Sequence, residues 1–229
     1  MSALKRDELI HGEPVVQVPA RNEIVRYTAG TRINHWIVAI SFVLLALSGL
    51  ALFHPAMFWL TNFFGGGTWT RILHPFIGLV MIIAFCLLGA KMWSDNRMQD
   101  RDWRWLKQAR DVVENREENL PDVGRYNAGQ KLVYWTIVVC LPLLLLSGIV
   151  IWRSYFAAYF PIELIRFSAL LHAFVAFVLI LTIVIHIYAA IWVRGSVRAM
   201  TRGTVSYGWA WKHHRLWFRE AVKGEAPPK

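Results

Sequence analysis

Residues 167–192 read FSALLHAFVAFVLILTIVIHIYAAIW, an apolar run that contains no Asp, Glu, Lys or Arg. The run exceeds the roughly 20 apolar residues that an α-helix needs to cross about 30 Å of hydrocarbon, so it predicts a membrane-spanning helix. Its two histidines, His172 and His186, lie fourteen residues apart. Because an α-helix has about 3.6 residues per turn and rises about 1.5 Å per residue, both imidazoles face one side, about 21 Å apart along the axis.

Composition places the whole chain in the membrane class. Hydrophobic residues make up 56% of the 229 residues, and charged residues make up only 17%. Apolar runs predict spanning helices at about 34–53, 73–92, 132–152 and 167–192. The predicted fold is an all-α integral membrane protein, a bundle of four transmembrane helices over residues 34–192. Residues 1–33 are expected to form a cytoplasmic N-terminal segment, and residues 193–229 a basic cytoplasmic C-terminal tail.

The distribution of positive charge predicts the orientation of these helices. All but three of the 25 Lys and Arg residues lie before the first helix, around the loop between the second and third, or after the fourth; the exceptions are Arg71, Arg153 and Arg166. The positive-inside rule therefore puts both termini and the middle loop in the cytoplasm. The first thirty residues do not resemble a cleavable signal peptide, so the first spanning helix is expected to act as the insertion signal. This topology explains most of the net charge of +10 and disfavours a nucleic-acid partner.

Metal chemistry in this chain depends on histidine. The two cysteines, Cys86 and Cys140, fall inside spanning helices as packing residues, and the sequence has no C-x-x-C-H motif for covalent haem attachment. His54 ends the first helix and is interpreted as structural. Three further histidines lie in polar tails, where solvent or lipid headgroups are the expected surroundings: His11, His213 and His214.

Depth in the bilayer pairs the remaining four histidines. His35 begins the first helix on the cytoplasmic side, and His74 begins the second helix on the outer side. The fourth helix runs from outside to inside, which matches His172 with His74 in the outer leaflet and His186 with His35 in the inner one. Two bis-histidine sites of this kind fit two six-coordinate b-type haems, which transfer electrons and leave no iron position for oxygen. The alternative is that these histidines only form hydrogen bonds between helices.

A weak internal repeat relates two helical hairpins. The segment from His35-Trp36 to Ser48-Gly49 matches the segment from Tyr134-Trp135 to Ser147-Gly148 with the same spacing. Aligning the second helix on the fourth then superposes His74 on His172. The glycines of the repeat would let a flat macrocycle approach the backbone, or would serve helix packing alone.

The middle loop, about residues 93–131, contains a second candidate site at its end. Its Trp103, Trp105 and basic residues are typical of membrane anchoring and headgroup binding. Asn127, Gly129 and Gln130 enter the third helix at the depth predicted for the inner histidines. Their amide and backbone groups could form hydrogen bonds with a quinone carbonyl.

Several strings of residues carry a family resemblance. They are RINHW at 32–36, RILHPF at 71–76, GRYNAGQK at 124–131, IWRSYF at 151–156, WVRGS at 192–196 and WKHH at 211–214. With them, about residues 24–220 resemble the gamma, cytochrome b subunit of bacterial respiratory formate dehydrogenase. The polar extension before Asn22 looks longer than is usual in that family.

The resemblance implies a place in anaerobic electron transport in the bacterial inner membrane. Formate would be oxidised on a molybdenum- or tungsten-containing alpha subunit, and electrons would pass through an iron–sulfur beta subunit to the outer haem at His74 and His172. From the inner haem at His35 and His186 they would reduce menaquinone or ubiquinone near the cytoplasmic face. In the family, the residue matching His186 also lies at the quinone pocket, beside those matching Asn127, Gly129 and Gln130; heterotrimers in a higher oligomer would fit this assembly too.

Other readings of the sequence stay open. The histidine pattern alone would equally fit the cytochrome b subunit of a membrane-bound hydrogenase or of a related oxidoreductase. A haem-free membrane anchor or transporter is a further alternative. Arg71, Arg153 and Arg166 lie near outer helix ends, where they would neutralise haem propionates, mark the interface or dock the iron–sulfur subunit.

Overall fold

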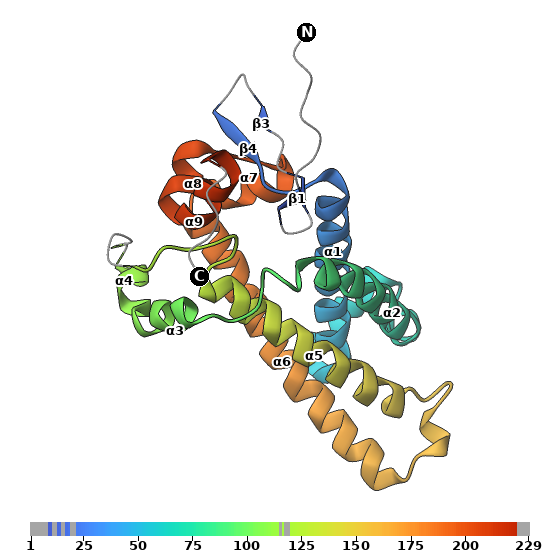
Figure 1. Cartoon of the computed structure of the whole chain (residues 1–229). Helices are drawn as coiled ribbons and strands as arrows, with labels where there is room; N and C mark the ends of the chain where they lie inside the picture. The colour runs from blue at the N-terminus through green and yellow to red at the C-terminus, as the bar shows by residue number, and fades with distance from the viewer. Residues whose placement is uncertain are drawn as a thin grey trace. The chain divides into compact units, whose positions relative to one another are not determined.

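Four long apolar helices form most of the structure. The computed structural model describes residues 9–10, 13–14, 17–18, 22–114, 116 and 120–223, and Figure 1 labels its elements. Four helices are long and apolar enough to cross a membrane: α1 (Ala29–Phe53), α2 (Gly67–Met92), α5 (Ala128–Ile151) and α6 (Ile162–Trp192). The predicted helical membrane fold is confirmed.

Each of these helices begins earlier than the apolar run that predicted it. α1 begins at Ala29 rather than at 34, α2 at Gly67 rather than at 73, and α6 at Ile162 rather than at 167. The physical reason is that hydropathy marks only the hydrocarbon, whereas backbone hydrogen bonding continues along the helix into the polar interface.

Contacts divide the structure into two units, and every long helix contributes residues to both. The apolar unit comprises Ile33–Gly89 and Trp135–Ile185, and the basic unit comprises the remaining described residues. Within the apolar unit the only Lys or Arg residues are Arg71, Arg153 and Arg166. The charge asymmetry of the sequence is therefore also an asymmetry between the two units.

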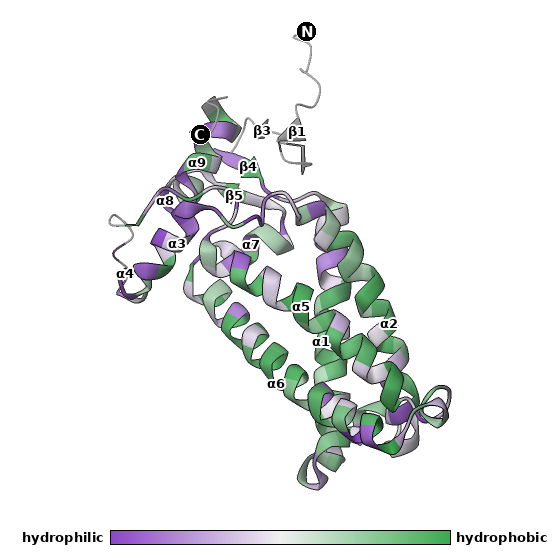
Figure 2. Cartoon of the chain, turned by 60° about the horizontal axis from the view of Figure 1, so that its bottom comes forward, coloured by the Kyte–Doolittle hydropathy of each residue, from purple (hydrophilic) through white to green (hydrophobic). Residues whose placement is uncertain are grey.

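The apolar unit packs all four helices around one core. Its buried residues are Met81, Cys140, Leu141, Val175 and Leu179. Large apolar side chains also cover the outside of this unit, including Ile83 at 64% and Leu170 at 72% exposure. Figure 2 shows hydrophobic residues along most of the four helices and hydrophilic ones over α3 (Asp100–Lys107) and α4 (Ala109–Val113). An apolar exterior over closed helical backbone is the surface that lipid requires.

Short 3₁₀ segments follow α1 and α5 in the apolar unit: η1 (Pro55–Phe64) and η3 (Ala157–Tyr159). The predicted structural role of His54 is confirmed, because His54 is the N-cap of η1 and its Nδ1 accepts the Ala56 N–H at 3.2 Å. Of the two cysteines, Cys140 is buried as expected, whereas Cys86 is exposed on the outside of the unit.

The basic unit contains small strands that the sequence did not predict. β3 (Gln17–Val18), β4 (Glu23–Val25) and β5 (Thr204–Ser206) form an antiparallel sheet in that order, and β1 (Leu9–Ile10) pairs with β2 (Glu13–Pro14). Helices after α6 complete the unit: α7 (Ser196–Thr201), α8 (Tyr207–His213), α9 (Arg215–Phe218) and the π-helical turn η4 (Arg219–Lys223). The sheet joins segments from the two ends of the chain.

Two buried arginines connect three distant segments in this unit. Arg26 is 2% exposed and Arg125 is 6% exposed, and each guanidinium donates to the backbone carbonyl of the other residue at 2.6 Å. The Arg26 guanidinium carbon lies 4.8 Å from the ring centre of the fully buried Trp217. The Asp95 carboxylate lies 3.6 Å from Arg125 Nε. These contacts join the start of the chain, the middle loop and the C-terminal helices.

The prediction that His214 is solvated in a polar tail is wrong. His214 is 1% exposed, and its Nδ1 lies 2.8 Å from Gly124 O. Because a carbonyl only accepts, Nδ1 carries the ring proton, and Nε2 accepts from Arg26 at 3.2 Å. The last helices fold over this side chain, which local hydropathy does not reveal. His213 is half-buried, and His11 lies outside the described residues.

The burial of His214 predicts acid-sensitive stability. Burial, reinforced by the charge of Arg26, holds the pKa of His214 well below 6.5. Below about pH 6.5 the unfolded chain therefore binds a proton at His214 that the folded chain does not bind. The contribution of neutral His214 to the free energy of unfolding is complete above about pH 6.5. It falls below that pH by up to about 1.4 kcal/mol per pH unit. The thermal midpoint of the detergent-solubilised protein should fall between about pH 7 and about pH 5.

The control for this measurement is His214→Asn, which retains an N–H donor for Gly124 O and removes the titrating ring. The variant should have a lower thermal midpoint at neutral pH and a shallower decline with acidification. Equal pH slopes for the variant and the parent protein would show that His214 is not the responsible group.

Candidate functional site

His74 of α2 and His172 of α6 come together in the apolar unit. Their ring centres are 6.3 Å apart, with 62° between the ring planes, and both residues are half-buried. A bond between a metal and an imidazole nitrogen is about 2 Å long, and that nitrogen lies about 1 Å from the ring centre, so two imidazoles on opposite sides of one metal have centres about 6 Å apart. The observed spacing matches this requirement.

A serine from the preceding helix of each hairpin contacts each ring. Ser48 Oγ of α1 lies 2.8 Å from His74 Nδ1, and Ser147 Oγ of α5 lies 3.0 Å from His172 Nδ1. Both hydroxyls also reach the carbonyl four residues earlier in their own helix, at 2.7 Å and 2.6 Å. The serines are 0% and 4% exposed, so these contacts are shielded from water.

The glycine after each serine gives the ring its space. A Cβ on Gly49 would meet His74 Cε1 at 3.5 Å, and a Cβ on Gly148 would meet His172 Cε1 at 3.3 Å. The second distance is tighter than ordinary van der Waals contact, so glycine at 148 permits the approach of the ring. The Ser-Gly repeat noted in the sequence therefore places the same two contacts in both hairpins.

The donor set of this pair fits a haem. Within the described part of the chain, no group of three or more His, Cys, Asp or Glu side chains is placed to hold a metal ion. Two imidazoles alone suit an iron whose four other ligands come from a porphyrin. His74 and His172 are the residues that would supply the axial nitrogens.

The two inner candidates belong to different units and are described separately. His35 of α1 is in the apolar unit, half-buried, with its ring 5.7 Å from that of Trp36. The neighbouring Asn34 donates from Nδ2 to Ala84 O of α2 at 3.1 Å. His186 of α6 is half-buried in the basic unit. Their pairing stays a prediction that rests on depth along the helices.

Asn127 and Gln130 form a reciprocal cap at the start of α5. The Asn127 N–H donates to Gln130 Oε1 at 3.0 Å, and the Gln130 N–H donates to Asn127 Oδ1 at 2.9 Å. This capping box uses an oxygen of each side chain, so the two NH₂ groups remain outside it. A Cβ on Gly129 would lie 3.4 Å from Asn127 Oδ1 and 3.5 Å from the Trp105 ring, which makes this turn compact.

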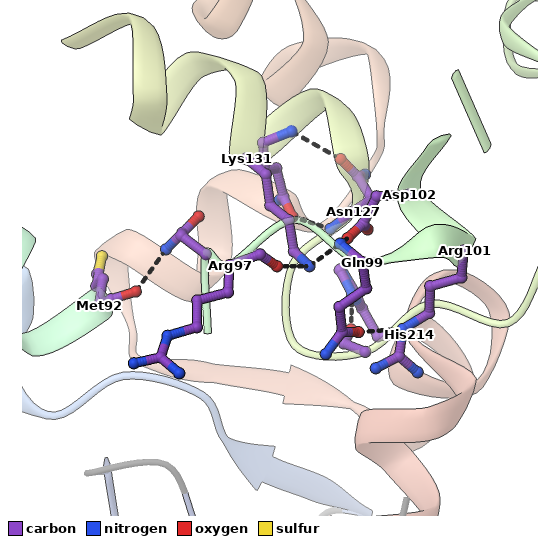
Figure 3. A network of polar contacts seen from close by, with 11 residues as sticks. Met92, Arg97, Gln99, Arg101, Asp102, Asn127, Lys131 and His214 are labelled. Atoms are coloured by element: carbon purple, nitrogen blue, oxygen red, sulfur yellow. Dashed lines mark hydrogen bonds and ion pairs between the residues drawn. The ribbon is translucent and has the colours of Figure 1, made fainter. Parts of the chain in front are cut away.

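A buried ion pair beside this cap was not anticipated from the sequence. Lys131 Nζ lies 2.7 Å from Asp102 Oδ2 and donates to Arg97 O at 2.9 Å, and both ionic residues are nearly inaccessible, at 4% and 5% exposure. The same Asp102 oxygen accepts the Gln99 N–H at 2.8 Å. Figure 3 shows Lys131 directed toward these groups, with Asn127 beside it. The pair ties α3 to the first turn of α5.

Three arginines lie on the surface of the apolar unit. Arg71, Arg153 and Arg166 are all exposed in the apolar unit. Arg71 lies 3.5 Å from Gly67 O within its own helix.

The chain is similar to known proteins over most of its length. Residues 26–203 match the family model described as prokaryotic cytochrome b561. The formate dehydrogenase cytochrome b556(fdo) subunit of Escherichia coli is 48% identical over 89% of this chain and 95% of its own length. The nitrate-inducible cytochrome b556(Fdn) subunit of the same species is 44% identical over 89% and 94%. The formate dehydrogenase cytochrome b556 subunit of Haemophilus influenzae is 39% identical over 90% and 87%. The chain therefore belongs to the prokaryotic cytochrome b561 family and, within it, to the formate dehydrogenase cytochrome b subunits.

Proposed function

We propose that this chain carries electrons from an iron–sulfur subunit of formate dehydrogenase across the bacterial inner membrane to a quinone. It would do so with two b-type haems, which when bound supply one-electron transfer. Formate oxidation would take place on a separate molybdenum- or tungsten-containing subunit. Both termini and the middle loop would face the cytoplasm, as the distribution of Lys and Arg predicts.

The single observation that supports this function most strongly is the pair His74 and His172. The ring centres lie 6.3 Å apart in a unit whose charged side chains are few and exposed. This spacing would suit two neutral imidazoles that hold one iron. A haem held by both imidazoles would supply electron transfer rather than oxygen chemistry.

α6 would carry one ligand of each haem. His172 and His186 lie fourteen residues apart on this helix, which corresponds to about 21 Å. His35 of α1 is the proposed partner of His186. Two sites held on one continuous helix need no moving part to connect the two sides of the membrane.

The start of α5 would bind the quinone near the inner haem. Asn127 and Gln130 hold each other in the capping box and present their NH₂ groups, which can donate to a quinone carbonyl. Gly129 keeps the turn compact, and the family resemblance adds His186 to this pocket. Reduction of a quinone takes up two electrons and two protons. Protons taken from the cytoplasm would make the reaction electrogenic without a proton pump.

Purification of the intact complex tests the proposal against its alternatives. Co-purification with iron–sulfur and molybdenum- or tungsten-containing subunits, together with formate-dependent quinone reduction, would support it. Hydrogen-dependent reduction with a hydrogenase partner would favour the alternative oxidoreductase. A well-folded protein whose reduced-minus-oxidised spectrum lacks b-type haem bands would indicate a membrane anchor or transporter.

Replacement of an outer ligand should remove one haem. His74→Ala or His172→Ala should lower haem affinity by more than about a hundredfold, because loss of an axial ligand costs more than loss of its supporting contacts. The pyridine haemochrome assay should then report one haem per chain, and formate should no longer reduce the remaining one. His54→Ala is the matched control and should retain both haems; equal loss in that variant would contradict the outer pairing.

Replacement of an inner ligand should give a different kinetic result. His35→Ala or His186→Ala should also leave one haem, but formate should still reduce it while quinone reduction stops. Stopped-flow spectra with formate, read with and without quinone, separate the two cases. If the His35 and His74 variants behave alike, the assignment of the two pairs to opposite ends of the electron path is wrong.

The quinone site can be tested without breaking the helix cap. Asn127→Asp and Gln130→Glu retain the oxygens of the capping box and remove the NH₂ donors. Each should raise the quinone KM by about three- to tenfold, the usual worth of one hydrogen bond, with both haems retained. Asn127→Ser is an uncharged control that also retains a capping oxygen and should show a similar increase. Unchanged KM in all three would exclude these amides from the site.

A further inference from the structure

We propose that Ser48 and Ser147 are positioning residues that hold His74 and His172 in the tautomer that can ligate iron, and that they lower the reduction potential of the haem bound there. The inference rests on the proposed function, since it concerns the haem between these two histidines. It concerns residues that touch the ligands rather than the cofactor.

A serine hydroxyl carries a single proton, which it can donate to one acceptor. Ser48 Oγ lies 2.7 Å from Leu44 O and 2.8 Å from His74 Nδ1. A carbonyl has no proton to give, so the hydroxyl proton goes to Leu44 O. The oxygen then faces the ring as an acceptor, and His74 Nδ1 must carry the proton that joins them.

The second hairpin repeats this arrangement. Ser147 Oγ lies 2.6 Å from Leu143 O and 3.0 Å from His172 Nδ1. The same proton count makes Nδ1 of His172 the donor. In both rings the neutral imidazole then keeps its lone pair on Nε2, the nitrogen that remains for a metal.

The serine contacts would also tune the iron. An imidazole that donates a hydrogen bond from Nδ1 is a more basic ligand through Nε2. A more basic ligand favours ferric over ferrous iron and lowers the reduction potential. Both serines are nearly inaccessible to water, so their contacts with the rings are shielded from solvent.

The test compares variants that differ only in the hydroxyl. Thr and Val have nearly the same shape, but only Thr offers an oxygen to the ring. In the purified holocomplex, Ser48→Val should raise the midpoint potential of one haem by about 59 mV, a tenfold change in the ferrous-to-ferric ratio, and Ser48→Thr should restore it toward the parent value. The other haem should keep its potential. Ser147→Val and Ser147→Thr should behave in the same way.

Ser41→Ala is the matched control, because Ser41 is buried on the same helix, two turns from Ser48. It should leave both potentials unchanged. If the Val variants lose the haem, retention in the Thr variants supports the hydroxyl role, and loss in both overturns it. Thr and Val variants with equal potentials would also overturn it, even in a complex with two normal haems. Absence of both haems from the parent protein would instead contradict the proposed function.

Discussion

An imidazole inside an apolar helix bundle needs a partner for each of its two nitrogens. The apolar unit places one such partner, a serine hydroxyl, beside each of two histidine rings. Nδ1 of His74 and Nδ1 of His172 lie 2.8 Å and 3.0 Å from the hydroxyl of a buried serine. A buried imidazole nitrogen without a partner is costly in a membrane, where water is absent. The packing of α1 against α2, and of α5 against α6, is what brings each serine to its histidine. Under the proposed function, a haem would be held by the Nε2 atoms of these two rings.

The basic unit, unlike the apolar unit, buries charged side chains. Arg26 and Arg125 exchange hydrogen bonds with each other's backbone, and His214 stays neutral between Arg26 and Gly124. At the first turn of α5, the buried Lys131 is likewise paired, with the carboxylate of Asp102. Loss of one partner of such a pair would leave an uncompensated buried charge close to the cap at Asn127 and Gln130.

Some features of the site could be predicted from the sequence, and others could not. The four helices and the approach of His74 to His172 followed from hydropathy and from spacing, because a bilayer leaves few arrangements for apolar runs. Ser48 and Ser147 appeared in the sequence only as part of a repeat, and their role depends on which way two hydroxyls point. The burial of His214 and the sheet that joins β4 to β5 depend on contacts between residues far apart in the chain. The hydropathy and spacing of neighbouring residues do not predict such long-range contacts.

Length, hydropathy and charge along the sequence predict a membrane protein with four spans and an uneven distribution of Lys and Arg, and they single out four histidines as candidate metal ligands. The reason is that the bilayer acts on each segment separately, through length, hydropathy and charge. The distance of 6.3 Å between the two rings, the serine hydroxyl beside each ring, and the buried cluster of Arg26, His214 and Trp217 arise only when the chain folds. Those features depend on distances of a few ångströms between separate segments, and packing alone sets such distances.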